Sequence, residues 1–157
     1  MQMRAAVLCR RWCDRKFMAH QDKAGAVLYA KDMACVSAFY AEVAGMAVTH
    51  AEKDFVTLES SSFQLVVVAM PASLAATVEI ATPPVRREDT PIKLIFAVQS
   101  ISAARVAAAR LGGELNGPER EWQFQGVRVC DGCDPEGNVV QFREKKILNS
   151  HPTLEII

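Results

Sequence analysis

Two cationic residues stand on predicted strands of this sequence, where they could bind a small anion. Lys93 begins the apolar run that ends at Val98, and Arg143 ends the run that begins at Val139. A planar guanidinium can hold a carboxylate with two hydrogen bonds, and an ammonium group adds a compact positive charge. This pair predicts a ligand with a carboxylate or another anionic group. The alternative is that both side chains extend to solvent while their stems cover apolar surface.

Four further residues on predicted strands are candidates for the same site. They are the polar or aromatic residues Tyr29, Gln64, Gln141 and Trp122. Alternation along a strand places Gln141 on the same face as Arg143, and Gln64 on the same face as Val66. The two glutamines could instead form a structural hydrogen-bonded pair, and Trp122 could belong to the core or to an interface. A mainly apolar wall with a few polar groups is typical of a small-molecule site.

The five cysteines allow one other kind of site. Cys9 with Cys13, and Cys130 with Cys133, could together supply four thiolates to a zinc ion. However, the segment around Cys9 lacks the turn residues of a zinc knuckle, and the second pair is predicted to lie in a loop. The odd count, together with Cys35 inside a predicted helix, also argues against a disulfide framework. We therefore expect reduced thiols.

Length and composition predict a single cytoplasmic domain. The chain has 157 residues, 50% of them hydrophobic, which is enough for one core. The formal net charge is zero, so the overall charge favours neither nucleic acid nor an acidic membrane surface as a partner. No apolar run approaches the roughly 18 residues of a membrane helix, and the N-terminal run is too short for a secretory signal.

The sequence divides into two similar halves. Residues 24–146 form the predicted domain, as modules 24–70 and 91–146 joined by a proline-rich linker, 71–90. A basic extension, residues 1–23, precedes the domain, and a tail, residues 147–157, follows it. Apolar runs predict strands at 26–30, 46–50, 55–59 and 63–69 in the first half, and at 93–98, 121–124, 127–130 and 139–143 in the second.

Each half also contains one predicted helix, and the two helices have the same kind of cap. Asp32 and Ser100 each precede an apolar repeat at helical spacing and can accept hydrogen bonds from backbone N–H groups. Gly45 ends the first helix, and Gly112-Gly113 ends the second. Ser100 follows Asp32 by 68 positions, and the same offset aligns further apolar residues of the two halves. An internal duplication of a βαβββ module is the simplest explanation.

Three stretches of the chain carry a family resemblance. They are Val27–Asp32 leading to Gly45, Ile95–Val98 leading to Gly112-Gly113, and the turn Asp134–Asn138. Over about residues 24–144 the chain resembles the vicinal oxygen chelate superfamily, which includes glyoxalase I, extradiol dioxygenases and bleomycin-binding proteins. The resemblance implies an α+β fold in which two βαβββ modules in tandem form a curved mixed sheet around a central cleft. It does not specify a reaction.

Metal-dependent members of that superfamily hold a divalent metal with side chains from four strands of the cleft. By resemblance, the corresponding positions here are Gly25, Gln64, Lys93 and Gln141. Gly25 has no side chain and a charged Lys93 has no lone pair, so two neutral amides beside an ammonium group would make a poor site. The three histidines lie elsewhere, at His20, His50 and His151. We therefore expect no metal or other cofactor.

These observations predict a small-molecule-binding protein that sequesters or senses an anionic or amphipathic molecule, as the bleomycin-binding relatives do by resemblance. The alternative is an enzyme, either a glyoxalase I-like lyase or a dioxygenase. It would use a divalent metal held by Gln64, Gln141 and a further ligand, or acid–base chemistry by Tyr29, Lys93 or a glutamate without a metal. Since members of this superfamily often pair, a homodimer is expected, and the apolar tail end, residues 154–157, could dock on a neighbour or on its own sheet.

Overall fold

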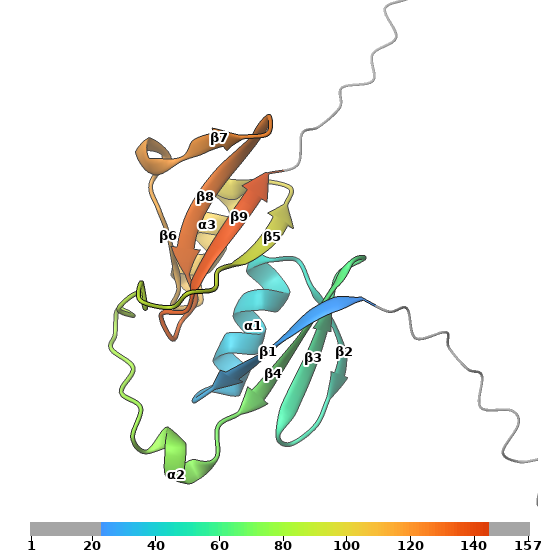
Figure 1. Ribbon diagram of the computed structural model, residues 1–157, viewed down its shortest axis with the longest axis vertical. Helices are drawn as coiled ribbons and strands as arrows, with labels where there is room; N and C mark the ends of the chain where they lie inside the picture. Colours follow the sequence, from blue (N-terminus) through green and yellow to red (C-terminus); the bar gives the residue numbers. More distant parts are fainter. Residues whose placement is uncertain (1–22, 145–157) are drawn as a thin grey trace, which may run out of the picture.

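The computed structural model describes residues 23–144, which form two α+β halves (Figure 1). The first half holds β1 (Ala24–Ala30), α1 (Met33–Val43), β2 (Ala47–Ala51), β3 (Phe55–Glu59) and β4 (Phe63–Ala69). The second half holds β5 (Leu94–Val98), α3 (Ile101–Arg110), β6 (Glu114–Leu115), β7 (Trp122–Phe124), β8 (Val127–Cys133) and β9 (Val139–Glu144). The prediction of two βαβββ-like modules is confirmed. Most of the basic extension and the whole tail lie outside the described residues.

Both main helices begin at their predicted caps. The Asp32 carboxylate accepts a hydrogen bond of 2.9 Å from the Cys35 N–H, and the Ser100 hydroxyl accepts one of 3.2 Å from the Ala103 N–H. These bonds satisfy N–H groups that the first turn of a helix leaves without a partner. The longer helix, α1, has 11 residues. None of the helices in residues 23–144 is long and apolar enough to cross a membrane.

The strands form two mixed sheets rather than one continuous sheet. The first has the order β1-β4-β3-β2 and the second β5-β9-β8-β6, with β7 also paired to β8. In each sheet one pair of strands is parallel, β1 with β4 in the first and β5 with β9 in the second. All other pairs are antiparallel. The edge of the second sheet is divided between β6 and β7 by a short 3₁₀ turn, Pro118–Arg120, whose first residue has no N–H to donate to a ladder.

The predicted end of β8 was wrong. We expected a strand to end at Cys130 and a loop to contain Cys133, and the next two residues, Asp131 and Gly132, have a weak strand preference. In the structure β8 continues to Cys133, since its last residues pair with β6 on one side and β9 on the other. Backbone hydrogen bonds to two neighbouring strands outweigh the weak strand preference of these residues.

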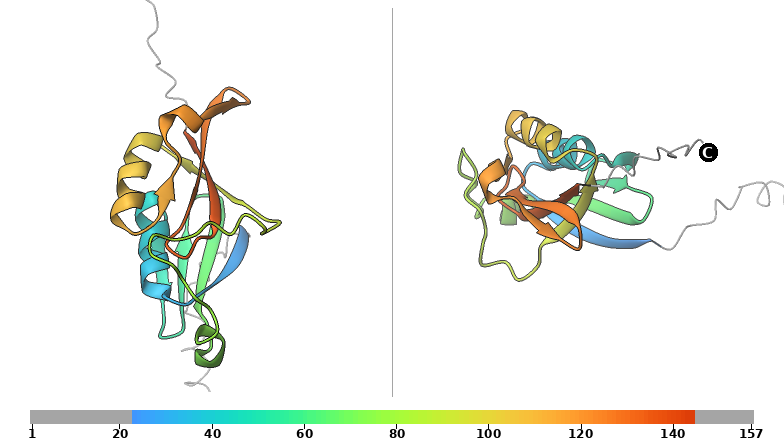
Figure 2. Two further views of the ribbon diagram at one scale, coloured as in Figure 1. Left: turned by 90° about the vertical axis from the view of Figure 1, so that its left-hand side faces the viewer. Right: turned by 90° about the horizontal axis from the view of Figure 1, so that it is seen from above.

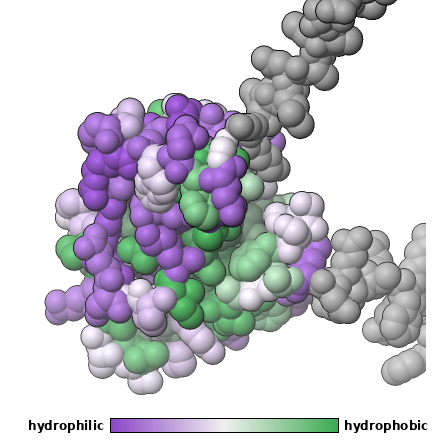
Figure 3. All heavy atoms as spheres, turned by 45° about the horizontal axis from the view of Figure 1, so that its top comes forward, coloured by the Kyte–Doolittle hydropathy of each residue, from purple (hydrophilic) through white to green (hydrophobic). Residues whose placement is uncertain are grey.

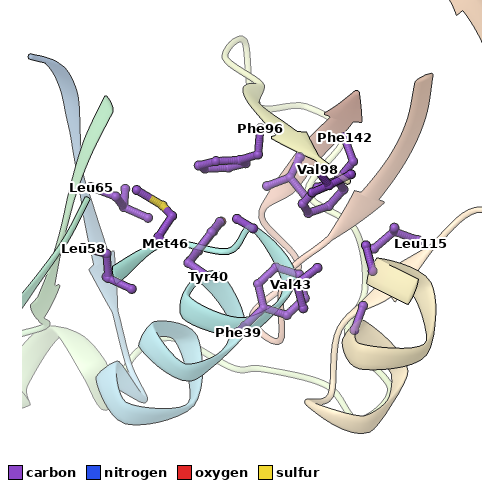
Figure 4. Close-up of a cluster of buried hydrophobic side chains, with 14 of the residues drawn as sticks. Phe39, Tyr40, Val43, Met46, Leu58, Leu65, Phe96, Val98, Leu115 and Phe142 are labelled. Atoms are coloured by element: carbon purple, nitrogen blue, oxygen red, sulfur yellow. The ribbon is translucent and has the colours of Figure 1, made fainter. Parts of the chain in front are cut away.

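The helices α1 and α3 lie on one side of the two sheets (Figure 2). On the other side, the linker crosses part of the second sheet. Between the layers lies a hydrophobic core shared by the two halves. The ring of Phe96 in β5 lies 5.3 Å from Tyr40 of α1, and 6.1 Å from both Phe63 of β4 and Phe142 of β9, measured between ring centroids. Figure 4 shows Phe96 between the side chains of the first half and those of the second. The two modules therefore form one folding unit.

The linker is tied to both halves, although its prolines and charges predict irregular structure. It contains one short helix that was not predicted, α2 (Ala72–Ala75). The Lys31 ammonium group donates a hydrogen bond of 2.6 Å to the carbonyl of Val78, and the Arg87 N–H donates one of 2.9 Å to the carbonyl of Gly137. These contacts hold the linker against β1 at one end and against the β8–β9 turn at the other.

Candidate functional site

The predicted site residues lie on the side of each sheet that faces away from the helices, here called the outward face. In β1, Leu28 packs against the core, whereas Val27 and Tyr29 are 59% and 56% exposed. In β5, Phe96 is buried and Ile95 is 50% exposed. The predicted alternation is confirmed, and it leaves large apolar side chains on both outward faces. Figure 3 shows hydrophobic surface between the two ends of the described chain, bordered by hydrophilic side chains.

Three predicted residues meet in one hydrogen-bonded chain on the outward face of the second sheet, here called the polar chain (Lys93, Asp131, Gln141 and Arg143). The Lys93 ammonium group donates to Asp131 Oδ2 at 2.6 Å, and the Gln141 amide donates to Asp131 Oδ1 at 3.2 Å. Arg143 Nε donates to Gln141 Oε1 at 3.2 Å. The guanidinium carbon of Arg143 also lies 4.9 Å from the ring centroid of Phe124, a cation–π contact.

The polar chain leaves one cation available to an anion. Asp131 forms an ion pair with Lys93 and so offsets its charge. Within residues 23–144, no carboxylate pairs with Arg143. Trp122, which is 39% exposed, lies opposite Val129 on β8, and Val129 lies opposite Arg143 on β9. An aromatic ring and a guanidinium therefore lie two strands apart on the same outward face.

The first sheet has a related but smaller polar group. The Gln64 amide donates to Glu59 Oε1 at 2.9 Å, and the Lys23 ammonium group donates to Glu59 Oε2 at 2.7 Å. In both sheets the glutamine therefore donates to the carboxylate directly opposite it on the neighbouring antiparallel strand, Glu59 for Gln64 and Asp131 for Gln141. The alternative in which the two glutamines bond to each other is not what the structure shows.

The strand register shows that the two glutamines do not occupy equivalent places. Gln64 lies opposite Gly25 in the first sheet, whereas Gln141 lies opposite Ile95 in the second. By the repeat of the helix caps, the counterpart of Gly25 is Lys93, two residues before Ile95. The place in the first sheet that matches Gln141 is therefore taken by the apolar Val66. The polar groups of the two sheets are thus at different positions along the strands.

The side chains at the four positions that correspond to metal ligands do not fit a divalent metal. Gly25 offers no donor atom, and the Lys93 ammonium group is bound to a carboxylate. The Gln141 amide oxygen already accepts a hydrogen bond from Arg143, so any cation there would lie beside a guanidinium group. Within the described part of the chain, no three His, Cys, Asp or Glu side chains are grouped so that they could hold a metal ion.

The thiols of β8 cannot meet at one zinc ion. Cys130 and Cys133 are three positions apart on one strand, so their side chains point to opposite faces. Both are fully buried, and burial raises the pKa of each thiol, even though Arg105 beside Cys130 acts in the opposite direction. Cys9 and Cys13 lie outside the described residues.

Most groups considered for acid–base chemistry are held in ion pairs. Lys93 is bound to Asp131, and Glu59 is bound to Lys23. Glu121, just before β7, forms ion pairs with two arginines and its side chain is only 9% exposed. The charge of each of these groups is therefore already engaged with a neighbouring opposite charge.

Asp131 is the site residue that sequence reasoning missed. It connects Lys93 with Gln141, yet the predicted strand ended one residue before it. The alternation of Val129, Asp131 and Cys133 along one face of an extended strand was the available signal.

A protein-family model described as a glyoxalase-like domain matches residues 25–142. No curated protein sequence matches the chain at a significant level.

Several solved structures share the fold. A bleomycin resistance determinant encoded on the transposon Tn5 is 16% identical, with a TM-score of 0.52, covering 80% of this chain and 99% of that one. A glyoxalase/bleomycin resistance protein/dioxygenase family enzyme from Burkholderia phytofirmans is 20% identical, with a TM-score of 0.55, covering 77% and 96%. A glyoxalase/bleomycin resistance protein from Albidiferax ferrireducens is 19% identical, with a TM-score of 0.54, covering 78% and 98%.

Proposed function

The chain belongs to the glyoxalase-like family of the vicinal oxygen chelate superfamily, and from this premise we propose that it binds a small amphipathic anion on its outward faces without a resident metal. The apolar part of the ligand packs on the exposed side chains of the sheets, and its anionic group pairs with Arg143. The structural neighbour named as a bleomycin resistance determinant supports a role in binding small molecules.

The observation that carries this proposal is the position of Arg143. Its guanidinium group packs on an aromatic ring and has no carboxylate partner within residues 23–144. The exposed Trp122 and Ile95 lie on the same outward face. A cation beside apolar surface is the arrangement that recognises an amphipathic acid, because burial gives affinity and the charge sets orientation.

A second copy of the chain is the partner that we propose to cover the outward face of the first sheet. Val27 and Tyr29 on this face are 59% and 56% exposed and lie outside the core. Exposed apolar surface of this kind marks an interaction site. The net charge of zero means that two copies do not repel each other over long distances.

The donor chemistry favours binding over metal-dependent turnover. A divalent metal needs carboxylate, imidazole or free carbonyl oxygens, whereas the corresponding positions hold a glycine, an ion-paired lysine and two amides that are engaged in hydrogen bonds. An acid–base enzyme is disfavoured because Lys93 and the nearby glutamates are held in ion pairs.

The proposal is tested by titrating the protein with decanoate and with decanol, which has the same chain length and no charge. Ligand binding is followed by isothermal titration calorimetry and by the intrinsic fluorescence of the two tryptophans, Trp12 and Trp122. We expect decanoate to bind about tenfold more tightly than decanol, since a charge-assisted hydrogen bond contributes about 1.5–3 kcal/mol.

Arg143→Ala should remove this preference and leave decanol binding unchanged. The control is Arg110→Ala on α3, since Arg110 pairs with Glu42 in the helix layer and its loss should change neither affinity. Equal binding of acid and alcohol by the unaltered protein would refute the proposal. Elemental analysis after dialysis against divalent metals tests the proposal that the protein holds no resident metal. Retention of one metal ion per chain would contradict it.

A further inference from the structure

An open pocket lies between the C-terminal end of α1 and the N-terminal end of α3. Its volume is ≈ 440 Å³, within the range of about 300–1,000 Å³ that ligand pockets have. Its lining is mostly apolar and comes from residues 42–45, from residues 97–100 and from three alanines of α3, Ala103, Ala104 and Ala107. The pocket is therefore built where the two halves meet.

The corresponding place at the other end of α3 is filled. The offset of 68 positions relates Gly45 to Gly113, and Phe39 to Ala107. A Cβ added at Gly113 would clash with the Phe39 ring, whereas a Cβ added at Gly45 would meet nothing within 4 Å. The pocket is thus the counterpart of a filled space, and it is open because the second half has an alanine where the first half has a phenylalanine.

The chain continues past its described residues beside this pocket. Glu144 is the last described residue and lies opposite Val98 in the parallel ladder of β5 and β9. Its carboxylate also accepts a hydrogen bond of 2.9 Å from the Ile101 N–H at the start of α3. Val98 itself lines the pocket. Neighbouring strands lie about 4.8 Å apart and four extended residues span about 13 Å, so the first residues after Glu144 can reach the pocket.

We propose that residues 145–148 cross the end of β5 and place the side chains of Ile147 and Leu148 in this pocket. These two are the first apolar residues after Glu144. Burial of two aliphatic side chains against an apolar lining removes their surface from water and so stabilises the docked segment. The inference is independent of the amphipathic anion proposed above, because it uses no residue that this anion contacts.

The charges at the pocket also fit this occupant. Among the residues that line it in the described part of the chain, only Glu42 is charged. The Glu42 carboxylate pairs with Arg110, and its side chain is still 46% exposed. Lys145 and Lys146 precede the apolar pair, and either can approach Glu42 as a second cation.

The first experiment measures NOEs in the full chain with ¹³C-labelled alanine, isoleucine and leucine methyl groups. We expect NOEs from Ile147 or Leu148 to Ala103 or Ala107, and their absence would overturn the proposal. A mixture of labelled and unlabelled chains shows whether each NOE arises within one chain. Contacts made only between chains would place the segment on a second copy and would also overturn the proposal.

Filling the pocket from α3 should displace the segment. Ala107→Phe restores the side chain that the first half has at this position, and Ala103→Phe blocks the exposed rim if the first variant does not fold. We expect the methyl shifts of Ile147 and Leu148 to move to the values of the same segment in a synthetic peptide. Ala109→Phe is the control, because Ala109 is exposed on the same helix and does not line the pocket. Unchanged shifts in the pocket variants would refute the docking.

The contribution of the segment to stability gives a separate test. Leu148→Asp should lower the midpoint of urea unfolding, because a charged side chain does not enter an apolar pocket and the docked contact is lost. Thr153→Asp adds the same charge to the same segment and should leave the midpoint unchanged. Equal midpoints for the two variants would count against the proposal and overturn it.

Discussion

The phenolic oxygen of Tyr40 lies 3.1 Å from Oδ2 of Asp134, and its hydrogen bond joins α1 of the first half to the β8–β9 turn of the second. Both side chains are fully buried. Burial raises the pKa of Tyr40 well above its usual value, and the neighbouring carboxylate adds to this effect. The same turn reaches the first half a second time, where the Glu136 carboxylate accepts a hydrogen bond of 2.6 Å from the Asp32 N–H. The two halves are therefore joined by polar contacts as well as by the core.

Tyr40→Phe should destabilise the protein by about 1–2 kcal/mol, because the buried carboxylate of Asp134 loses one donor while the ring keeps its packing. Urea unfolding measures the change. Tyr29→Phe is the control, since Tyr29 is 56% exposed and its loss of a hydroxyl should change the free energy of unfolding by less than about 0.5 kcal/mol. Equal stability of Tyr40→Phe and the unaltered protein would contradict the structural role of the bond.

Asp134→Asn should cost more, about 2–3 kcal/mol. Besides Tyr40, the carboxylate accepts hydrogen bonds from the N–H groups of Glu136 and Asn138 and from the Asn138 side chain. All of these partners are donors, so the amide NH₂ of an asparagine would face another donor. Thermal unfolding of the two variants should give a lower midpoint for Asp134→Asn than for Tyr40→Phe, and the reverse order would count against this reading.

Gly137→Ala should loosen the linker. Gly137 has a φ of 83°, and a Cβ there would clash with the Val85 carbonyl oxygen. We expect a loss of at least about 1 kcal/mol from the backbone conformation, and faster cleavage by trypsin after Arg86 and Arg87. Gly45→Ala is the matched control, because its φ is 64° but nothing lies within 4 Å of the added Cβ. It should lose stability without faster cleavage of the linker, and equal cleavage rates would refute the contact.

Glu144→Gln should make stability less dependent on pH in the acid range. The Ile101 N–H and the Arg128 guanidinium both donate to Glu144, and they lower its pKa from 4.5 in the folded chain. Its contribution is therefore present above pH 4.5 and is lost as the pH falls through the lower, folded pKa. We expect the variant to be about 1 kcal/mol less stable at neutral pH and equal to the unaltered protein below the folded pKa. The free energy of unfolding, measured across this pH range with Glu52→Gln as the control, tests this expectation.

Val27→Asp should prevent self-association if a second copy covers the outward face of the first sheet. The charge would have to be buried without a partner, which a stable interface does not tolerate. Sedimentation should show a dimer for the unaltered protein and a monomer for the variant. Val106→Asp on α3 is the control, because Val106 is 72% exposed on the helix side. A monomer at all concentrations of the unaltered protein would refute the proposed dimer.

Local features of the fold could be predicted because they depend on neighbouring residues. The caps at Asp32 and Ser100 each need only an N–H three residues later. The faces of β1 and β5 follow from alternation, since a strand places successive side chains on opposite sides. The end of β8 was missed because two neighbouring strands, and not its own residues, hold it extended.

The sequence by itself determined the duplicated βαβββ pattern, the core side of each strand, and the outward position of Gln64, Gln141 and Arg143, but not that of Asp131. Only the tertiary structure decided which of these residues meet. Asp131 joins Lys93 to Gln141 because β8 lies beside β9 in one particular register, and the linker lies against the second half because the Arg87 N–H donates a hydrogen bond to the Gly137 carbonyl. Register and chain crossing depend on contacts between residues far apart in the sequence, and a short-range pattern does not encode them.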